Sequence, residues 1–249
     1  MEVFYFTGKG NRATNEDSLL LNSKLLTSKN MKTTKKFNVL NLKYNKFLIA
    51  DGIGGFSKGE IASSGVLSIL KKINRKFNQE ILKNLIYNSK EYLKYLSLTQ
   101  NINRLGSTVA GVLLTSENKN YAFNIGDSRI YKLSFKNIEL LSYDHSLGME
   151  LVEMGLISSK FLRYHKSRNV LTSSITNKMP INKINYKEFI FNKNEILLIC
   201  SDGVWEQLEE EDLLKLYKKY KSIEEFVKIL FSLIKTNPAD NISFIVIKK

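Results

Sequence analysis

The chain has 249 residues, of which 43% are apolar, and a formal net charge of +14. This length and composition allow a sizeable buried core in one domain, while no run of about 18 apolar residues marks a membrane-spanning helix. Cys200 is the only cysteine, which excludes an intramolecular disulfide and favours a reducing compartment. Because the first residues show no signal-peptide pattern, we expect a soluble, cytoplasmic protein.

The predicted β-strands are short runs rich in β-branched and aromatic residues that end in turn residues. In chain order they lie at 3–6, 47–50, 107–114, 121–125, 129–133, 195–200 and 242–247. Consecutive strands over 107–142 favour antiparallel hairpins over a doubly wound parallel sheet. We therefore expect an α+β fold in which helices cover antiparallel sheets.

Apolar residues that recur every three or four positions predict helices over 60–76, 79–97 and about 222–235. The first and the last of these helices follow an S-x-x-E sequence, which is typical of a capping box. Ser57 pairs with Glu60 in one box, and Ser222 pairs with Glu225 in the other. These signals predict where the two helices begin.

Four aspartates lie at the ends of apolar runs, namely Asp51, Asp127, Asp202 and Asp240. A sheet fixes the end of each strand, while the adjoining turn leaves a carboxylate there open to solvent. A single Asp at a strand end is usually a turn residue, but four of them with the nearby Glu16-Asp17 pair indicate a shared site. Such an all-oxygen cluster selects hard cations such as magnesium, manganese or calcium.

Zinc is disfavoured, since the two histidines and Cys200 cannot supply the usual nitrogen and sulfur ligands. Two hard cations about 3.5–4 Å apart would activate a shared water and clamp the oxygens of an in-line displacement at phosphorus. The glycines of the loop 51–60 can bring backbone carbonyls close to a metal, although this loop has neither P-loop nor dinucleotide spacing. Phosphoester hydrolysis is the reaction that this chemistry favours.

The order of these motifs resembles the bacterial branch of the protein phosphatase 2C family, the metal-dependent protein phosphatases. The matching segments are Gly10-x-Arg12 with Asn15-Glu16-Asp17, ADGIGG (50–55), GSTVAG (106–111), IGDSRIY (125–131), DHS (144–146), NVLT (169–172), CSDGVW (200–205) and DNISFIVI (240–247). They run from about residue 4 to the C-terminus, so the resemblance implies a single catalytic domain over 1–249. It also implies a four-layer α-β-β-α sandwich with two central antiparallel sheets and a metal site at one edge.

The resemblance implies the metal ligands residue by residue. Asp51 would bridge two Mn²⁺ or Mg²⁺ ions, and the carbonyl of Gly52 would bind one of them. Asp202 and Asp240 would complete the ligand set. Asp127 matches the position that, together with Asp202, holds a weaker third ion with fewer carboxylates.

The resemblance also implies which residues act on substrate and water. Arg12 would grip the substrate phosphate, for which a planar donor fork is well suited. Glu16 and Asp17 would act on metal-bound waters. Ile53 stands where many eukaryotic members carry a histidine proposed as a general acid, and the segment 177–180 lacks the glycine that is usual there, which leaves the neighbouring flap without a predicted geometry.

The resemblance implies a protein-serine/threonine phosphatase that cleaves phosphoserine and phosphothreonine by direct attack of a metal-activated water. We expect a monomer that acts on phosphorylated proteins, with a serine/threonine kinase and its targets as partners and no membrane partner. The alternative is a non-catalytic pseudophosphatase that only binds phosphoproteins. Such proteins usually lack metal-binding aspartates, which this sequence retains.

A serine esterase built on Gly126-Asp127-Ser128 is a further alternative, but it needs a histidine base and no histidine follows His165. His145 lies in the DHS motif, which looks structural in the family, and His165 lies in a basic loop beside the flap. We expect neither histidine to be catalytic.

The net charge could indicate nucleic-acid binding. Only six of the 38 basic residues are Arg, and the abundance of Lys, Asn and Ile is typical of a low-GC genome. The lysines of 27–36 have no interleaved aromatic residues for base stacking, so we interpret this segment as a flexible loop between strands. We expect no nucleic-acid partner, although the basic surface can attract acidic, phosphorylated substrates.

Overall fold

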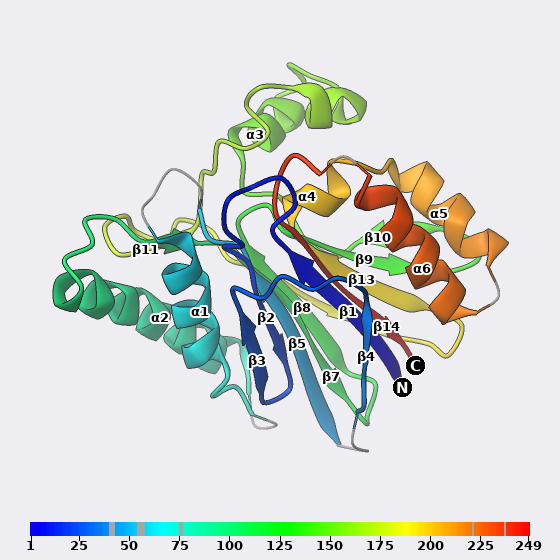
Figure 1. The fold of residues 1–249 in the computed structure, drawn as a ribbon, viewed down its shortest axis with the longest axis horizontal. Helices are drawn as coiled ribbons and strands as arrows, with labels where there is room; N and C mark the ends of the chain where they lie inside the picture. Colours follow the sequence, from blue (N-terminus) through cyan, green and yellow to red (C-terminus); the bar gives the residue numbers. More distant parts are fainter. Residues whose placement is uncertain (40–42, 54–57, 75–76, 221, 237) are drawn as a thin grey trace.

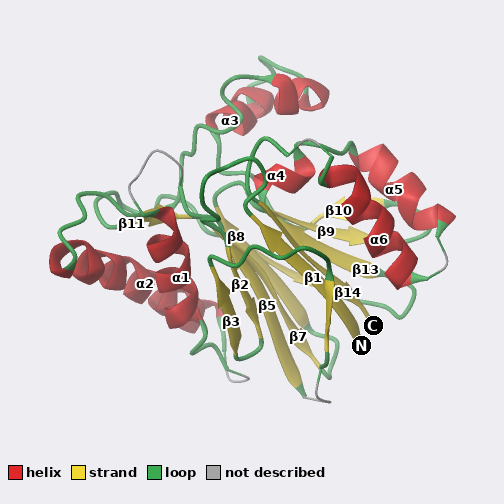
Figure 2. Cartoon of the chain, viewed as in Figure 1, coloured by secondary structure: helices red, strands yellow, loops and turns green. Residues whose placement is uncertain are grey.

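The computed structural model describes residues 1–39, 43–53, 58–74, 77–220, 222–236 and 238–249. Within them, two six-stranded antiparallel sheets pack face to face, and helices cover both outer faces (Figures 1 and 2). The predicted α-β-β-α sandwich is therefore confirmed. No helix in the described part of the chain combines the length and the apolar character needed to traverse a bilayer.

The first sheet contains both ends of the chain. Its strands, in spatial order, are β10 (Ile138–Leu140), β9 (Arg129–Leu133), β13 (Ile196–Cys200), β14 (Ile242–Lys248), β1 (Glu2–Gly8) and β4 (Lys35–Phe37). Helices α5 (Glu210–Lys219) and α6 (Ile223–Ile234) cover its outer face. The short helix α4 (Asp202–Trp205) directly follows β13.

The second sheet is built from the middle of the chain. Its strands, in spatial order, are β12 (Asn185–Phe189), β8 (Asn120–Ile125), β7 (Val109–Thr115), β5 (Tyr44–Ala50), β2 (Ser18–Leu21) and β3 (Lys24–Thr27). Helices α1 (Gly59–Leu70) and α2 (Gln79–Thr99) cover its outer face. A small third ladder pairs β6 (Gly106–Ser107) with β11 (Ile175–Thr176), and α3 (Leu147–Glu153) and the 3₁₀ helix η1 (Ser159–Tyr164) stand apart from the sandwich.

The central strands are continuous apolar runs because both of their faces are buried. In β14, Phe244 and Val246 pack under α5 and α6, while Ile245 and Ile247 face the other sheet. Strand β5 alternates in the same way between the sheet interface and α1 and α2. This period of two packs each strand between the sheet interface and the covering helices.

Each of the seven predicted strands is present, but the region 107–142 divides between the two sheets. Strands β7 and β8 form a hairpin in the second sheet, whereas β9 and β10 form one in the first. The turn 126–128 therefore carries the chain from one sheet to the other. This crossover places Asp127 at the edge where the two sheets meet.

Two predictions about the helices are wrong in detail. The helix predicted over 60–76 ends at Leu70, where the buried ammonium of Lys46 donates to the carbonyls of Lys71 and Ile73 and satisfies the end of the helix. Ser222 is the N-cap of α6, but its side chain makes no capping hydrogen bond.

The predicted capping box of the first helix cannot be followed, because Ser57 lies outside the described residues. Lys58 is the N-cap of α1, with a left-handed φ of 69° and no side-chain cap.

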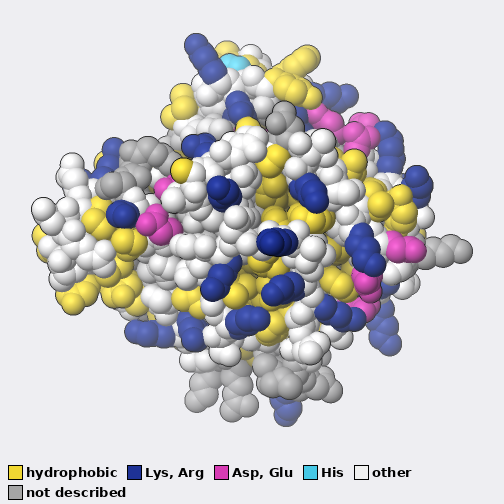
Figure 3. Space-filling view, viewed as in Figure 1, with side chains coloured by type: hydrophobic (Ala, Val, Ile, Leu, Met, Phe, Trp, Pro, Cys, Tyr) yellow, Lys and Arg dark blue, Asp and Glu magenta, His cyan; other side chains and the backbone are white. Residues whose placement is uncertain are grey.

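The positive charge of the chain is spread over its surface. Figure 3 shows Lys and Arg side chains across the face that carries β1, β4 and α6, with few acidic side chains between them. Lys35 and Lys36 belong to the edge strand β4, where charged side chains discourage pairing with another sheet. The loop predicted over 27–36 is shorter in the structure, because Thr27 belongs to β3 and Lys35 and Lys36 belong to β4; residues 28–34 connect the two strands.

Candidate active site

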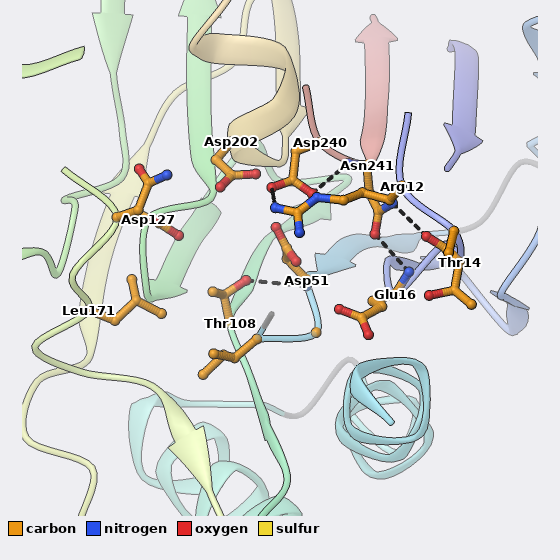
Figure 4. Close-up of a pocket in the computed structure, with 14 residues that line it drawn as sticks. Arg12, Thr14, Glu16, Asp51, Thr108, Asp127, Leu171, Asp202, Asp240 and Asn241 are labelled. Carbon is orange, nitrogen blue, oxygen red and sulfur yellow. Dashed lines mark hydrogen bonds and ion pairs between the residues drawn. The ribbon is translucent and has the colours of Figure 1, made fainter. Parts of the chain in front are cut away.

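A pocket with a volume of about 390 Å³ opens at the edge where strands of both sheets end. Five carboxylates line it: Glu16, Asp51, Asp127, Asp202 and Asp240. Figure 4 shows Asp51 in the middle, close to Asp202, Asp240 and Thr108, with Asp127 and Glu16 on opposite sides. The acidic residues that the sequence places at separate strand ends thus meet in one cavity.

The sheet topology brings these carboxylates together. Asp51 follows β5, Asp202 follows β13 as the first residue of α4, and Asp240 precedes β14. Strand β13 pairs with β14, so their loops lie side by side. Asp17 precedes β2, whose Ser18 pairs with Ala50, and this register sets Asp17 beside Asp51.

Two glycines are required by close backbone contacts. A Cβ atom at Gly52 would lie 2.4 Å from the backbone of Gly59, and one at Gly203 would lie 2.0 Å from the carbonyl oxygen of Asn241. The Asp-Gly pairs therefore allow α1 and the 240–241 loop to approach the two aspartates. Larger residues at these positions would push the carboxylates apart.

Thr108 and Ser128 link the loops that carry Asp51 and Asp127. The Thr108 hydroxyl accepts a hydrogen bond from the Asp51 amide at 3.2 Å, and the Thr108 amide donates to the Asp51 carbonyl at 2.8 Å. Its hydroxyl also lies 2.9 Å from that of Ser128. Sequence reasoning assigned no role to Thr108, although it lies in the GSTVAG motif.

Ser128 is fully buried in this pair. It is not an exposed nucleophile beside a histidine, so the esterase alternative has no support.

The turn that carries Asp127 is fixed by neighbouring side chains. Gly126 has a φ of +100°, and its amide donates to His145 Nδ1 at 3.1 Å. Burial lowers the pKa of His145 to about 4, so the neutral ring accepts this bond. The indole of Trp205 donates to the Asp127 carbonyl at 2.9 Å and stacks against the buried guanidinium of Arg129 at 3.7 Å.

The DHS motif is thus a structural support for this turn, as predicted. Trp205 lies in the CSDGVW motif, and no sequence signal indicates its contact with Arg129.

Asn241 organises the loop that carries Arg12 and Glu16. Its Nδ2 donates to the carbonyls of Lys9 and Thr14, and its Oδ1 accepts from the Glu16 amide at 2.8 Å. The side chain of Arg12, which is 53% exposed, reaches over the pocket and donates to Asp240 Oδ2 at 2.6 Å. A strong cationic donor therefore stands at the entrance of an otherwise acidic cavity.

The carboxylates of the pocket are buried close together and repel one another. Burial, followed by repulsion from neighbouring aspartates, raises the pKa values of Asp51 and Asp202 well above their usual range. Burial also raises the pKa of Asp127 to about 7 and that of Asp17 to about 6. Among the described residues only Asp240 has a cationic partner within this pocket. Such a concentration of negative charge favours the binding of cations.

Asp17 differs from the other predicted site residues, because it does not line the pocket. It is fully buried, and its Oδ2 accepts a hydrogen bond from Ser201 at 3.1 Å. Its Oδ1 has no hydrogen-bond partner among the described residues. An unpartnered buried carboxylate oxygen beside Asp51 indicates that the protein alone does not satisfy this cluster.

The residues present fit hard divalent cations. The donors are carboxylates and backbone carbonyls, and His165 and His145 lie in hydrogen bonds away from the pocket. No three acidic, histidine or cysteine side chains of the described residues converge on one point. Magnesium and manganese fit this arrangement, because such ions keep several waters and need only one or two carboxylates each.

Comparisons with known proteins agree with the fold and identify the family. A family model described as "Protein phosphatase 2C" matches residues 37–240. The "Serine/threonine phosphatase stp" of Listeria welshimeri is 26% identical over 216 residues, which cover 81% of this chain and 83% of that protein.

Solved structures show the same architecture. Stp1, a serine/threonine phosphatase from Staphylococcus aureus, superposes with a TM-score of 0.81 at 25% identity, covering 99% of this chain and 94% of the other. The catalytic domain of the serine/threonine protein phosphatase PstP in complex with two manganese ions superposes with a TM-score of 0.74 at 20% identity, covering 99% of this chain and 98% of that domain. The second similarity is evidence for the fold alone.

Proposed function

Since the chain belongs to the protein phosphatase 2C family and is a protein-serine/threonine phosphatase, we propose that divalent cations in the acidic pocket support its hydrolysis of phosphoserine and phosphothreonine. The convergence of five carboxylates beneath one arginine is the observation that carries this proposal. A binding-only role would not need so costly a cluster of buried charge. Its retention supports catalysis over the pseudophosphatase alternative.

The proposed ligands of two Mn²⁺ or Mg²⁺ ions are Asp51, shared by both, with the Gly52 carbonyl, Asp202 and Asp240. We assign Asp127, together with Asp202, to a weaker third ion. The two manganese ions bound by the PstP domain support the choice of metal. When bound, such ions would polarise the phosphate and lower the pKa of a water that serves as the nucleophile.

Arg12 is proposed to bind the substrate phosphate. Its guanidinium already donates to the carboxylate of Asp240, which shows that the fork can be directed at an anionic oxygen in the pocket. Half of this side chain is exposed, so it can exchange Asp240 for a phosphate oxygen without disturbing the core. The substrate is thereby held over the carboxylate cluster.

Glu16 and Asp17 have different proposed roles. Glu16 lines the pocket, and burial raises the pKa of its carboxyl, so it is placed to hold a proton near the substrate. Asp17, predicted to act on a metal-bound water, does not line the pocket. We therefore propose that it is instead a positioning residue beside Asp51, where it accepts a hydrogen bond from Ser201.

We propose that residues 1–249 act as one catalytic domain and as a monomer. Its substrates would be phosphorylated proteins, including a serine/threonine kinase and the targets of that kinase. The exposed lysines and arginines of Figure 3 support attraction of acidic substrates. We expect no partner among nucleic acids or membranes.

Phosphate release from matched phosphothreonine, phosphoserine and phosphotyrosine peptides tests the proposal. We expect hydrolysis of the first two peptides, loss of activity on chelation, and recovery when manganese is added. Turnover that persists undiminished in excess chelator, with metal removal verified by elemental analysis, would rule out metal dependence. Equal turnover of the phosphotyrosine peptide would argue against the proposed substrate class.

A further inference from the structure

A second depression adjoins the active-site pocket. The two cavities share Ile53, Asn169 and Leu171, so they lie side by side. The second has a volume of about 210 Å³, against about 390 Å³ for the first. It is too small for a folded domain but suits side chains of an extended peptide whose phosphorylated residue lies in the active site. We call it the side groove.

The walls of the side groove are tied together. Asn177 accepts a hydrogen bond from the Leu105 amide at 3.0 Å and donates to the Ser97 hydroxyl at 2.8 Å. Next to it, β11 pairs with β6 in a short antiparallel ladder. These bonds join the segment that follows α2 to the segment 169–182. Hydrogen bonds therefore fix the segments around the side groove relative to each other.

The charge of the side groove is opposite to that of the active-site pocket. Residues 92–116 and 154–187, which supply nearly all of its lining, contain no Asp or Glu. Arg104 is the one charged side chain among the described residues that line it. Asn169 and Ser174 also line it, and their side chains make no hydrogen bond to other described residues. A positive charge and two available polar side chains thus face this cavity.

We propose that the side groove binds the residues next to the phosphorylated residue of the substrate and selects an Asp or Glu side chain there. Arg104 attracts such a side chain in the side groove, while the pocket beside it holds the phosphorylated residue and the proposed cations. The two cavities share lining residues and an extended peptide advances about 3.3 Å per residue, so the selected position is close to the phosphorylated one in the peptide. This inference deepens the proposed function and rests on it.

The test uses phosphothreonine peptides that differ at one position. Each carries Glu, Gln or Lys at one of the three positions on either side of the phosphothreonine, and kcat/KM is measured with manganese present. We expect Glu to exceed Gln by about 5-fold on one side, which is the range of a partly exposed ion pair, and the preference to shrink at high salt. Arg104→Glu should abolish or reverse this preference.

Lys83→Glu is the matched control, since it makes the same charge change at an exposed site in the first half of α2. It should keep the wild-type preference. Equal loss of preference in both variants would show a bulk charge effect and overturn the proposal, as would equal kcat/KM for all peptides with the wild type. If Arg104→Glu does not fold, Ser174→Asp serves instead and should lower kcat/KM for the Glu peptide selectively; no such loss overturns the proposal.

Hydrolysis of p-nitrophenyl phosphate by the wild type separates the two proposals. This substrate has no neighbouring residues and does not depend on the side groove. If the wild type fails to hydrolyse it in manganese, the proposed function is wrong, and the inference falls with it. If p-nitrophenyl phosphate is hydrolysed but the wild type shows no preference among the peptides, the proposed function stands and only the role proposed for the side groove is wrong.

Discussion

Asp127→Asn measures most directly how much a buried carboxylate of the acidic pocket destabilises the metal-free protein. Asp127 is only 4% exposed, and its carboxylate makes no hydrogen bond to a side chain or to strand β9 in the described structure. Burial, followed by repulsion from Asp144, raises its pKa to about 7 from an ordinary 3.8. An asparagine has nearly the same shape and carries no charge. In metal-free protein the substitution should therefore be stabilising.

The magnitude follows from the shift in pKa. The folded protein favours the protonated, uncharged form of Asp127, because its folded-state pKa is raised. Asp127 therefore does not destabilise the fold below pH about 4, and its charge destabilises the fold increasingly as the pH rises through about 7. The shift from 3.8 to about 7 corresponds to about 4 kcal/mol. At pH 8 without metal, the free energy of unfolding of Asp127→Asn should exceed that of the wild type by about this amount, which corresponds to a Tm higher by roughly 10 °C for a chain of this size.

Thermal unfolding in excess chelator at pH 4, 6 and 8 is the assay. We expect the wild type and Asp127→Asn to melt together at pH 4 and to separate progressively towards pH 8. Added manganese should raise the Tm of the wild type by binding the folded state. If the variant is no more stable than the wild type at pH 8, then Asp127 serves to cap the turn between β8 and β9 and the electrostatic reasoning is refuted.

Three further substitutions test separate parts of the site. Asp51→Asn should lower kcat on a phosphothreonine peptide at least ~100-fold, given the several kcal/mol that a metal contributes to the transition state, and wild-type kinetics would overturn the assignment. Arg12→Ala should raise KM while leaving the Tm unchanged, because its half-exposed side chain holds phosphate rather than the fold; an unchanged KM would contradict this. Asp144→Ala should cost about 3–5 kcal/mol in urea unfolding, since it leaves the buried guanidinium of Arg129 with only the more distant Glu210, at 3.8 Å, as an anionic partner, and a cost below about 1 kcal/mol would show that the pair is dispensable.

Local patterns in the sequence predict antiparallel sheets covered by helices and a cluster of acidic strand ends, whereas the four-layer sandwich follows from the family resemblance. Strand β13 is apolar over its whole length and β14 is mostly apolar, as expected for strands that are buried on both faces. Asp202 and Asp240 stand directly at the ends of these strands, and their pairing brings the two carboxylates to one edge. Fixed strand ends leave little freedom in where such residues lie.

Features that depend on long-range contacts are not predictable in this way. The carbonyls that follow α1 accept hydrogen bonds from Lys46, a residue of another element, and the position of Asp17 depends on the register of β2 against β5. The contact of Trp205 with Arg129 joins α4 to β9 across many residues of chain. None of these contacts leaves a signal in the spacing of apolar or polar residues.

Calorimetric titration of manganese into metal-free protein tests the central claim most directly, because it counts ions without relying on turnover. We predict that the wild type binds at least two ions, that Asp51→Asn loses tight binding of both, and that Asp127→Ala keeps two tight ions while losing a weaker third. Binding of one ion or none by the wild type, or two tight ions retained by Asp51→Asn, would contradict a shared cation site built on Asp51.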